Sequence, residues 1–410
     1  MRVQRAAVVG AGAMGSGIAC VLSQCGIEVL LKDVEQQAVE RGVANIKRMY
    51  DSRVKKGSMT QEEADKHFLL VKGTTSYDDF KNVDLVIEAA FEEISVKLDI
   101  FKTLDEICPA RAILATNTSA LSVSEIAAAT SRPQKVLGMH FFNPAQFMKL
   151  VEVIPGVKTS PETIKAALTL CQDMQKTPVR VEECPGFLVN RVLFTYMNEA
   201  LYALQEGVAT PEEIDAKVVE FGLPMGPFAL FDMTGIDVCA HVTEFLYSQY
   251  GPRFKPASLL AKLVKEKQLG QKTGAGFYVH DKDAPKGQAK TVNPKLAAMI
   301  SEIQKSEPAK ASGFDVHRVI LPMLNEAVYC LQEGVVEVSD IDLAMQNGCG
   351  FKRGIVALAK EKGLPWCLNE LKAMQTHGEE RFRPSWLMQK LVGAGIKDLH
   401  ELDKKPVGVA

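Results

Sequence analysis

The sequence predicts an α/β domain of the Rossmann type, followed by two tandem all-α domains. Three observations predict this fold class: strands alternate with helices over residues 1–185, a glycine-rich turn follows the first strand, and the helical remainder repeats itself. The chain has 410 residues, 47% hydrophobic and 24% charged, as in ordinary globular proteins. The formal net charge of −2 argues against a nucleic-acid partner, and the apolar runs are too short to span a bilayer.

Seven buried strands are expected in the first domain. Each is a short apolar run that alternates with a helical stretch, the pattern typical of a parallel sheet covered by helices. The expected strands are residues 6–9, 28–32, 85–89, 112–115, 136–140, 150–154 and 179–182. After Cys184-Pro185-Gly186 the pattern becomes helical, with long periodic runs at residues 189–206 and 211–221.

The helical part contains two copies of one sequence pattern. Residues 186–215 and 313–342 align in one register, with NEALYALQEGV in the first copy and NEAVYCLQEGV in the second. Further on, RFKPASLLAKLV in the first copy matches RFRPSWLMQKLV in the second. Similarity this long exceeds what helix periodicity produces, so we expect a duplicated module. The predicted domains are residues 1–185, 186–285 and 313–410, with a linker at 286–312 that contains a short helix.

The string GAGAMG stands between the first strand and a helix, as in dinucleotide-binding turns. Gly10 allows the tight turn, Gly12 lets the backbone approach a pyrophosphate, and Gly15 lets helix and strand pack closely. Ala13 and Met14 open the helix, whose first N–H groups hold phosphates. The alternative is an ordinary strand–helix turn without a ligand.

An acid stands at the end of the second strand. Asp33 follows Gly15 by 18 residues, close to the ~20 expected for the carboxylate that accepts the ribose hydroxyls of NAD. The same carboxylate would repel the 2′-phosphate of NADP, at a cost of about 4 kcal/mol for a ~4 Å like-charge pair. The neighbouring Lys32 offsets this repulsion only if its side chain points in the same direction as that of Asp33. NAD is therefore the expected cofactor.

The cysteines and the first residues of the chain indicate where the protein is located in the cell, and the cysteines also indicate whether it binds a metal. Nine cysteines occur without CxxC spacing, so we expect buried thiols in a reducing cytoplasm and no metal site. The opening residues lead directly into a strand without the layout of a signal peptide. A cytoplasmic location is therefore expected, with no membrane partner.

His140 and Glu152 are the candidate acid–base residues. His140 ends the strand 136–140 at the carboxyl edge of the sheet, where open α/β folds place ligands. Glu152 lies in the apolar run LVEV and needs a charged or donor partner there. If the two meet, Glu152 fixes the tautomer of His140 and leaves its other nitrogen as a general base. Spacing alone leaves open a core histidine and an unrelated acid.

Other polar candidates stand at the sheet edge and in the first helical copy. Ser119 ends LATNTS, and Asn190 begins the first copy; each alone is also consistent with a helix cap. Lys272 lies in GQKTGAGFY, a loop without a counterpart in the second copy, and His317 takes the place of Asn190 there. We therefore expect the first copy to be functional and the second architectural.

A basic cluster follows the second strand. Such a run is usually a solvated helix face, but in a nearly neutral protein it is also a candidate patch for a phosphate-bearing carrier. The cluster consists of Lys47, Arg48, Arg53, Lys55 and Lys56.

Over nearly its whole length the chain resembles the 3-hydroxyacyl-CoA dehydrogenase family. The resemblance implies NAD-dependent interconversion of (S)-3-hydroxyacyl-CoA and 3-oxoacyl-CoA, in fatty-acid β-oxidation or in 3-hydroxybutyryl-CoA metabolism. The strings that carry it are GAGAMGSGIA, EAAFEEISVK, TNTSALSV, HFFNPAQFMKLVEV, PGFLVNR, GLPMGPFALFDMTGID and KTGAGFY.

The resemblance also implies roles for single residues. His140 would be the general base and acid, Glu152 would orient it, and Ser119 and Asn190 would position the substrate oxygens. The basic residues Arg53, Lys55 and Lys56 would lie near coenzyme A, although this stretch does not align cleanly. The implied cofactor-binding residues are Gly10, Gly12, Ala13, Met14, Gly15, Asp33, Glu92, Lys97, Asn117, Ser119, Asn143 and Lys272.

The duplication departs from the simplest members of this family, which carry one helical module and dimerise through it. Here both modules occur in one chain, as in the dehydrogenase half of the multifunctional β-oxidation enzymes. Because the chain starts on its first strand, we expect a stand-alone dehydrogenase that acts on acyl-CoA, either a monomer with an internal pseudo-dimer or a homodimer.

Two alternatives remain open at this stage. One is a dehydrogenase of a CoA-free 3-hydroxy acid, as in the family branch that includes lambda-crystallin and gulonate dehydrogenase. The basic cluster and the β-oxidation-like duplication argue against it. The other is a non-catalytic NAD-binding protein, which the complete set of expected catalytic residues argues against.

Overall fold

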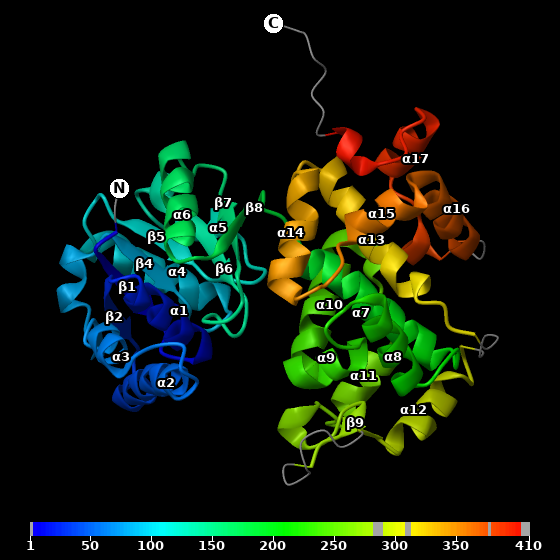
Figure 1. Ribbon diagram of the computed structural model, residues 1–410, viewed down its shortest axis with the longest axis horizontal. Helices are drawn as coiled ribbons and strands as arrows, with labels where there is room; N and C mark the ends of the chain where they lie inside the picture. The colour runs from blue at the N-terminus through cyan, green and yellow to red at the C-terminus, as the bar shows by residue number, and fades with distance from the viewer. Residues whose placement is uncertain (1–2, 282–289, 308–312, 376–378, 403–410) are drawn as a thin grey trace, which may run out of the picture. The chain divides into compact units, whose positions relative to one another are not determined.

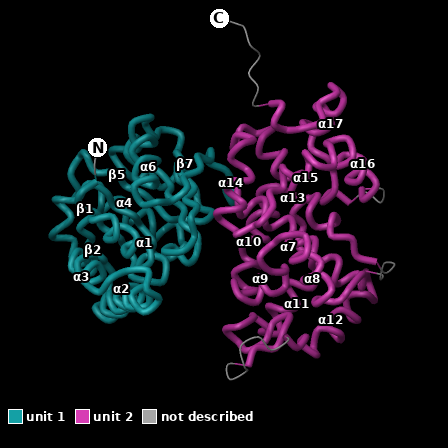
Figure 2. The backbone as a smooth tube through the Cα atoms, viewed as in Figure 1, with its two compact units in different colours: residues 1–187 teal, residues 188–410 magenta. Residues whose placement is uncertain are grey.

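The computed structural model describes residues 3–281, 290–307, 313–375 and 379–402. It divides into two compact units, Met1–Phe187 (unit 1) and Leu188–Ala410 (unit 2), which Figure 2 distinguishes by colour. Within these described ranges, no helix combines the length and apolar character needed to cross a bilayer.

Unit 1 is built on one eight-stranded sheet with the order β3-β2-β1-β4-β5-β6-β7-β8 (Figure 1). The strands from β1 to β6 pair in parallel, β7 runs antiparallel to β6, and β8 is parallel to β7. The strands are β1 (Arg5–Val9), β2 (Glu28–Lys32), β3 (Val71–Thr74), β4 (Leu85–Glu88), β5 (Ile113–Thr116), β6 (Val136–Phe141), β7 (Leu150–Pro155) and β8 (Thr177–Arg180).

The expectation of a parallel sheet was wrong at one junction, where β7 runs antiparallel to β6. Only eight residues connect Phe141 to Leu150, and a parallel crossover needs a dozen or more, so β6 and β7 pair as antiparallel neighbours. Strand β3 was missed because its four residues are partly exposed and include Gly73, which leaves no apolar run to detect. Strand β8 begins two residues earlier than predicted.

Helices cover both faces of this sheet. Alternate residues of β1 point to opposite faces: Ala6 and Val8 join a core with helices α1, α2 and α6, while Ala7 and Val9 join a second core with α4 and α5. This confirms the predicted Rossmann-type layers. The helices are α1 (Ala13–Gln24), α2 (Gln36–Lys55), α3 (Gln61–Phe68), α4 (Ile94–Ile107), α5 (Val123–Ala128) and α6 (Pro161–Asp173).

Unit 2 is helical, as predicted. Its helices are α7 (Val189–Gln205), α8 (Pro211–Phe221), α9 (Pro227–Thr234), α10 (Ile236–Tyr250), α11 (Ser258–Lys265), α12 (Lys295–Ile303), α13 (His317–Gln332), α14 (Val338–Cys349), α15 (Ile355–Lys362), α16 (Leu364–Met374) and α17 (Trp386–Gly393). A short ribbon of β9 (Tyr278–Val279) and β10 (Thr291–Val292) lies between α11 and α12. The short helix expected in the linker is α12; residues 282–289 and 308–312 of that segment lie outside the described ranges.

The two sequence copies contact each other through equivalent residues. Arg191 of α7 binds Glu326 of α13 at 2.6 Å, and the equivalent Arg318 of α13 binds Glu199 of α7 at 2.7 Å. Arg191 also binds Glu333 at 2.6 Å, and Arg318 binds the equivalent Glu206 at the same distance.. Each copy thus supplies the same arginine and the same carboxylates to the other, which is the pattern of a self-complementary two-fold interface.

Candidate active site

The glycine turn between β1 and α1 has the geometry expected of a dinucleotide site. Gly10 has φ of 106°, and a Cβ there would lie 2.4 Å from the carbonyl oxygen of Ala89; at Gly15 a Cβ would lie 1.8 Å from the carbonyl oxygen of Gly10. Both glycines are therefore required by the fold itself. A Cβ at Gly12 would meet nothing within 4 Å, so this glycine leaves open space for a ligand.

The start of α1 is available to an anion. The helix begins at Ala13, its N-cap Gly12 has no capping side chain, and its first turn holds no acid. Gly12 and Ala13 are exposed and Met14 is half-buried. The unpaired N–H groups of a first turn carry a partial positive charge, which suits the pyrophosphate of NAD.

Asp33 ties the end of β2 to this turn. Its Oδ2 accepts a hydrogen bond from the Ala11 N–H at 2.7 Å, and its Oδ1 accepts one from the Val34 N–H at 2.7 Å. A carboxylate has about four acceptor positions, so two remain for the ribose hydroxyls. Lys32 is buried and lies 4.1 Å from the centre of the Tyr77 ring. Its ammonium therefore contacts that ring.

His140 and Glu152 meet on adjacent strands. They are paired directly in the antiparallel register of β6 and β7, and His140 Nδ1 lies 2.7 Å from Glu152 Oε2. Glu152 is completely buried and His140 is 5% exposed. Opposed residues of an antiparallel pair point to the same face, which explains why a spacing of 12 residues brings the two side chains together.

This pair can exchange a proton with a ligand. Because a carboxylate only accepts hydrogen bonds, Nδ1 carries the proton and Nε2 keeps its lone pair. The rings of Phe142 and Phe187 lie 4.5 Å and 5.9 Å from the imidazole, centre to centre. The apolar surroundings strengthen the interaction of an imidazolium with Glu152. The arrangement therefore suits general acid–base catalysis.

A buried ion pair supports the loops beside Ser119. Lys97 is 1% exposed, and its Nζ lies 2.7 Å from Glu88 and 3.3 Å from Glu92. Glu92 in turn accepts hydrogen bonds from the Thr118 hydroxyl at 2.6 Å and from the Ser119 N–H at 2.7 Å. Lys97 and Glu92 thus hold the segment that carries Ser119, while their contact with the cofactor stays a prediction.

Glu88 was missed by the sequence analysis. This residue ends β4 with no exposed surface, and it also accepts hydrogen bonds from the Thr116 hydroxyl and the Ala90 N–H, each at 2.7 Å. The detectable signal was an acid that closes the apolar run LVIE. A buried carboxylate of this kind requires a cation, and Lys97 supplies it.

The two asparagines predicted at the cofactor have different surroundings. Asn117 is nearly buried, and its Oδ1 accepts a hydrogen bond from the Phe141 N–H at 2.8 Å, which holds the end of the strand that carries His140. Asn143 is exposed in the β6–β7 loop. Ser119 is half-buried in the loop after β5, three residues beyond its end. Their contacts with ligands remain predictions.

Asn190 and Lys272 belong to unit 2. Asn190 is half-buried in the first turn of α7. Lys272 binds Oδ2 of Asp237 at 2.5 Å. The loop that carries Lys272 is held by Asp232, a buried acid that accepts hydrogen bonds from the N–H groups of Phe277 and Tyr278 at 2.8 Å and 2.9 Å. The roles of Asn190 and Lys272 toward unit 1 also stay predictions.

The basic cluster lies on α2 and at its end. Lys47 pairs with Asp51 at 2.8 Å, Arg48 binds Asn45, and Arg53 donates to Gln24 at 2.5 Å. The other two members have exposed side chains: Lys55 ends the helix, and Lys56 lies 5.9 Å from the Phe147 ring centre.

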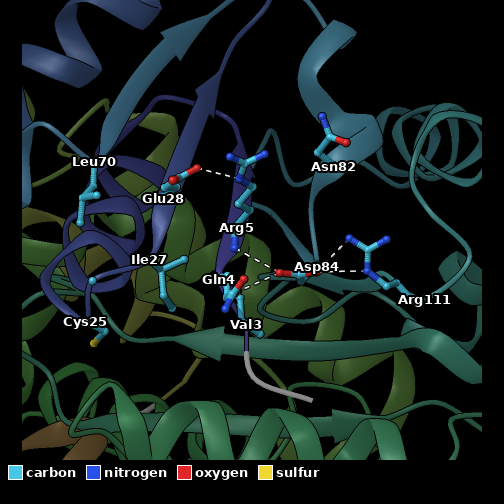
Figure 3. A pocket seen from close by; sticks show the side chains of 11 residues that line it. Val3, Gln4, Arg5, Cys25, Ile27, Glu28, Leu70, Asn82, Asp84 and Arg111 are labelled. Carbon is cyan, nitrogen blue, oxygen red and sulfur yellow. Dashed lines mark hydrogen bonds and ion pairs between the residues drawn. The ribbon is translucent and has the colours of Figure 1, made fainter.

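Unit 1 also has a polar cavity of about 660 Å³, whose lining includes Arg5, Glu28, Asp84 and Arg111 (Figure 3). It opens at the amino ends of β1 and β2, opposite the glycine turn. Its charges satisfy one another: Arg5 pairs with Glu28 at 2.7 Å and Arg111 with Asp84 at 3.1 Å. Ligands of open α/β folds bind at the carboxyl ends of the strands, so this cavity is not part of the candidate site.

The sheet order, the glycine turn and Asp33 together define a dinucleotide-binding protein of the Rossmann class. The family model of the "3-hydroxyacyl-CoA dehydrogenase, NAD binding domain" matches residues 5–184, and that of the "3-hydroxyacyl-CoA dehydrogenase, C-terminal domain" matches residues 186–280 and 313–401. The chain therefore belongs to the 3-hydroxyacyl-CoA dehydrogenase family, whose nucleotide domain binds NAD. This confirms the resemblance and the predicted cofactor.

Individual relatives are similar over much of the chain. A 3-hydroxybutyryl-CoA dehydrogenase of Clostridioides difficile is 45% identical over 279 residues, which are 67% of this chain and 99% of the relative. A fatty acid oxidation complex subunit alpha of Shewanella amazonensis is 37% identical over 96% of this chain, which spans 56% of that relative. The crystal structure of 3-hydroxybutyryl-CoA dehydrogenase from Escherichia coli K12 has a TM-score of 0.85 at 33% identity and covers 96% of this chain and 100% of that one.

Proposed function

We propose that this chain interconverts (S)-3-hydroxyacyl-CoA and 3-oxoacyl-CoA with NAD, using His140 as general base and acid. The observation that carries the proposal is the buried contact of 2.7 Å between His140 and Glu152 at one edge of a dinucleotide-binding sheet. Membership of the 3-hydroxyacyl-CoA dehydrogenase family supports the choice of substrate.

The proposed reaction is a proton transfer coupled to a hydride transfer. NAD, when bound, supplies the acceptor for the hydride that leaves C3 of the substrate. His140 Nε2 takes the proton of the 3-hydroxyl group, and the electron pair of that O–H bond forms the new carbonyl. Glu152 stabilises the resulting imidazolium through Nδ1. In the reverse direction His140 returns the proton to the oxygen.

The remaining roles follow the same proposal. Ser119 and Asn190 position the substrate oxygen, while Asn143 and Lys272 contact the cofactor. Arg53, Lys55 and Lys56 bind the phosphates of coenzyme A, since cations clustered at the end of α2 suit that carrier.

The wider setting is also part of the proposal. The symmetric ion pairs between α7 and α13 support a duplicated helical domain that acts as an internal pseudo-dimer. The names of the relatives support a place in fatty-acid oxidation or in 3-hydroxybutyryl-CoA metabolism. We propose a cytoplasmic location.

NADH oxidation tests the substrate class directly. We expect acetoacetyl-CoA to be reduced with a kcat/KM at least about 100-fold above that of free acetoacetate, because the carrier adds binding energy used in the transition state. Equal values for the two substrates would favour a CoA-free hydroxy acid. No turnover of either, with tight NADH binding, would contradict an enzymatic role.

The coenzyme A patch has its own test. In the double variant Lys55→Glu/Lys56→Glu we expect KM for acetoacetyl-CoA to rise about tenfold or more. The two substitutions replace cations by carboxylates, which repel the negatively charged phosphates of coenzyme A. The matched control is Lys72→Glu, an exposed lysine on β3, for which we expect no change. Equal KM values in the double variant and the control would place coenzyme A elsewhere.

A further inference from the structure

A lysine outside the predicted site holds the loop between the strands of His140 and Glu152. Lys176 directly precedes β8, and its Nζ donates to the carbonyl oxygens of Ala145 at 2.6 Å and Met148 at 2.7 Å. Both carbonyls belong to residues 142–149, the β6–β7 loop, which also carries Asn143. A single ammonium therefore binds this loop at two points, three residues apart.

The other side of the loop packs against α1, the helix that begins at the glycine turn. A Cβ at Gly17 of α1 would lie 3.0 Å from Ala145 Cβ and 3.1 Å from Gln146 Oε1. The approach is close enough that only a glycine fits without a shift. The β6–β7 loop is thus held between the cofactor helix on one side and Lys176 on the other.

The side chain of Lys176 is half-buried. The groups that face it are the thiols of Cys20 and Cys25 at the end of α1, Arg53 of α2 and Cys171 of α6. Asp173 and Lys149 line the same cavity, which has a volume of about 280 Å³. Within the described part of the chain, no carboxylate pairs with Lys176. Its charge is therefore satisfied by the two loop carbonyls.

Burial lowers the pKa of Lys176 to about 8. The neighbouring thiols are neutral at about pH 8, because burial raises the pKa of Cys20 to about 11 and that of Cys171 to about 12. Burial also raises the pKa of Cys25. A neutral amine still donates, but it loses the strength that charge adds to a hydrogen bond.

We propose that Lys176 is a positioning residue of the dehydrogenase: by binding both carbonyls it keeps the β6–β7 loop against α1 and so holds Asn143 in place beside the cofactor helix. The inference rests on the proposed function. Lys176 acts through the loop and contacts neither substrate nor cofactor. The dyad of His140 and Glu152 is held by strand pairing instead, so it keeps its geometry without Lys176.

One substitution of Lys176 and a matched control test its hold on the loop. In Lys176→Met, which removes all donors, we expect kcat for acetoacetyl-CoA reduction to fall about tenfold, as for loss of charge-assisted hydrogen bonds. KM for acetoacetyl-CoA should change less than kcat does, since Arg53, Lys55 and Lys56 themselves are retained. Amide hydrogen exchange should rise at residues 143–149 and stay unchanged in β1. The control Lys149→Met removes an exposed lysine at the end of the same loop and should alter none of these values.

The pH profile separates positioning from simple packing. The profile is measured for oxidation of (S)-3-hydroxybutyryl-CoA, the direction in which His140 acts as a base and gains activity as pH rises. In the wild type we expect kcat in this direction to decline above about pH 8 as Lys176 loses its proton. Lys176→Arg keeps the charge at all accessible pH values, so this decline should move upward by one pH unit or more. Cys25→Ser should leave it in place, which excludes the nearest exposed thiol as its cause.

The outcomes are distinguishable. Wild-type kcat and wild-type exchange in Lys176→Met would overturn the proposal. If Lys176→Met does not fold, the proposal would be overturned by a decline of kcat in Lys176→Arg at the same pH as in the wild type. If the wild type does not reduce acetoacetyl-CoA, the proposed function fails, while unchanged amide exchange in Lys176→Met would still exclude any hold on the loop.

Discussion

His140 and Glu152 face each other on one rung of the β6–β7 ladder, with Nδ1 and Oε2 2.7 Å apart. The rung is set by backbone hydrogen bonds between two fully buried strands. The imidazole is therefore oriented before any ligand binds, and no loop movement is needed to form the pair. Preorganisation of this kind lowers the cost of reaching the transition state.

The carboxylate of Glu152 is expected to matter for the rate rather than for cofactor binding. In Glu152→Gln the imidazolium loses its counter-charge, so kcat should fall about 10²-fold or more, while the dissociation constant of NADH stays within about twofold. Steady-state kinetics with acetoacetyl-CoA and a fluorescence titration with NADH measure the two values. The matched control is Glu182→Gln, an acid that pairs with Arg180 at the surface. Equal kcat in both variants would remove Glu152 from the mechanism.

Asp33 is expected to select NAD over NADP. Asp33→Asn keeps an acceptor for the Ala11 N–H but removes the charge, so affinity for NADH should fall about tenfold, as for loss of hydrogen bonds to a charged group. Affinity for NADPH should rise, because the repulsion of its 2′-phosphate is gone. Titration of both nucleotides checks the ratio. A ratio unchanged from the wild type would show that specificity resides elsewhere.

Arg191 is expected to contribute strongly to stability. Its guanidinium is completely buried between Glu326 and Glu333. Arg191→Met removes one of the two cations at Glu326, which keeps Arg253 at 3.0 Å. The free energy of unfolding should therefore fall by about 3 kcal/mol, the lower end for a broken buried ion pair. The exposed pair of Lys72 and Asp79 provides the control: Lys72→Met should cost no more than about 1 kcal/mol. Urea denaturation of the full chain measures both. Equal, small effects would contradict the account of the interface.

Asp215 is expected to make stability depend on pH. Burial raises the pKa of Asp215 to about 6, although it accepts hydrogen bonds from the N–H of Phe228 and the hydroxyl of Tyr278. The folded chain therefore holds a proton that the unfolded chain releases near pH 4. The stability contributed by this group falls as pH rises from about 4 to about 6, by roughly 2–3 kcal/mol.

The variant Asp215→Asn removes this titration. The difference in unfolding free energy between wild type and Asp215→Asn should therefore shift against the wild type by about 2 kcal/mol between pH 4 and pH 7. Urea denaturation across that range measures it. Parallel curves for the two proteins would show that Asp215 does not titrate in this window.

The parts of unit 1 that the sequence predicted are those with strong local signals. The GAGAMG turn and Asp33 were predictable because glycine conformation and strand–helix alternation are encoded within about 30 residues. Strand β3 gave no such signal, because a short, partly exposed strand contains neither an apolar run nor a clean alternation. The antiparallel direction of β7 could be predicted only from the short connection between Phe141 and Leu150. The apolar composition of β7 indicates a buried strand but not its direction.

Long-range pairing explains most of what the sequence did not show. The repeat in unit 2 was visible, yet nothing local indicated that Arg191 would bind Glu326, 135 residues away. The contacts of Lys97 with Glu88, and of Lys176 with the β6–β7 loop, depend in the same way on packing between elements. The pairing of His140 with Glu152 depended on a register that only the assembled sheet reveals.

The most direct measurement of the central claim is NADH oxidation with acetoacetyl-CoA by the wild type and by His140→Ala. Loss of the general acid should lower kcat by about 10²–10⁴-fold, while NADH binding changes little. Because the buried Glu152 loses its imidazole partner, the variant should also be less stable. The two rates are therefore compared at a temperature at which both proteins are folded. That result would support proton transfer through His140. A kcat in His140→Ala within a few fold of the wild type would contradict it.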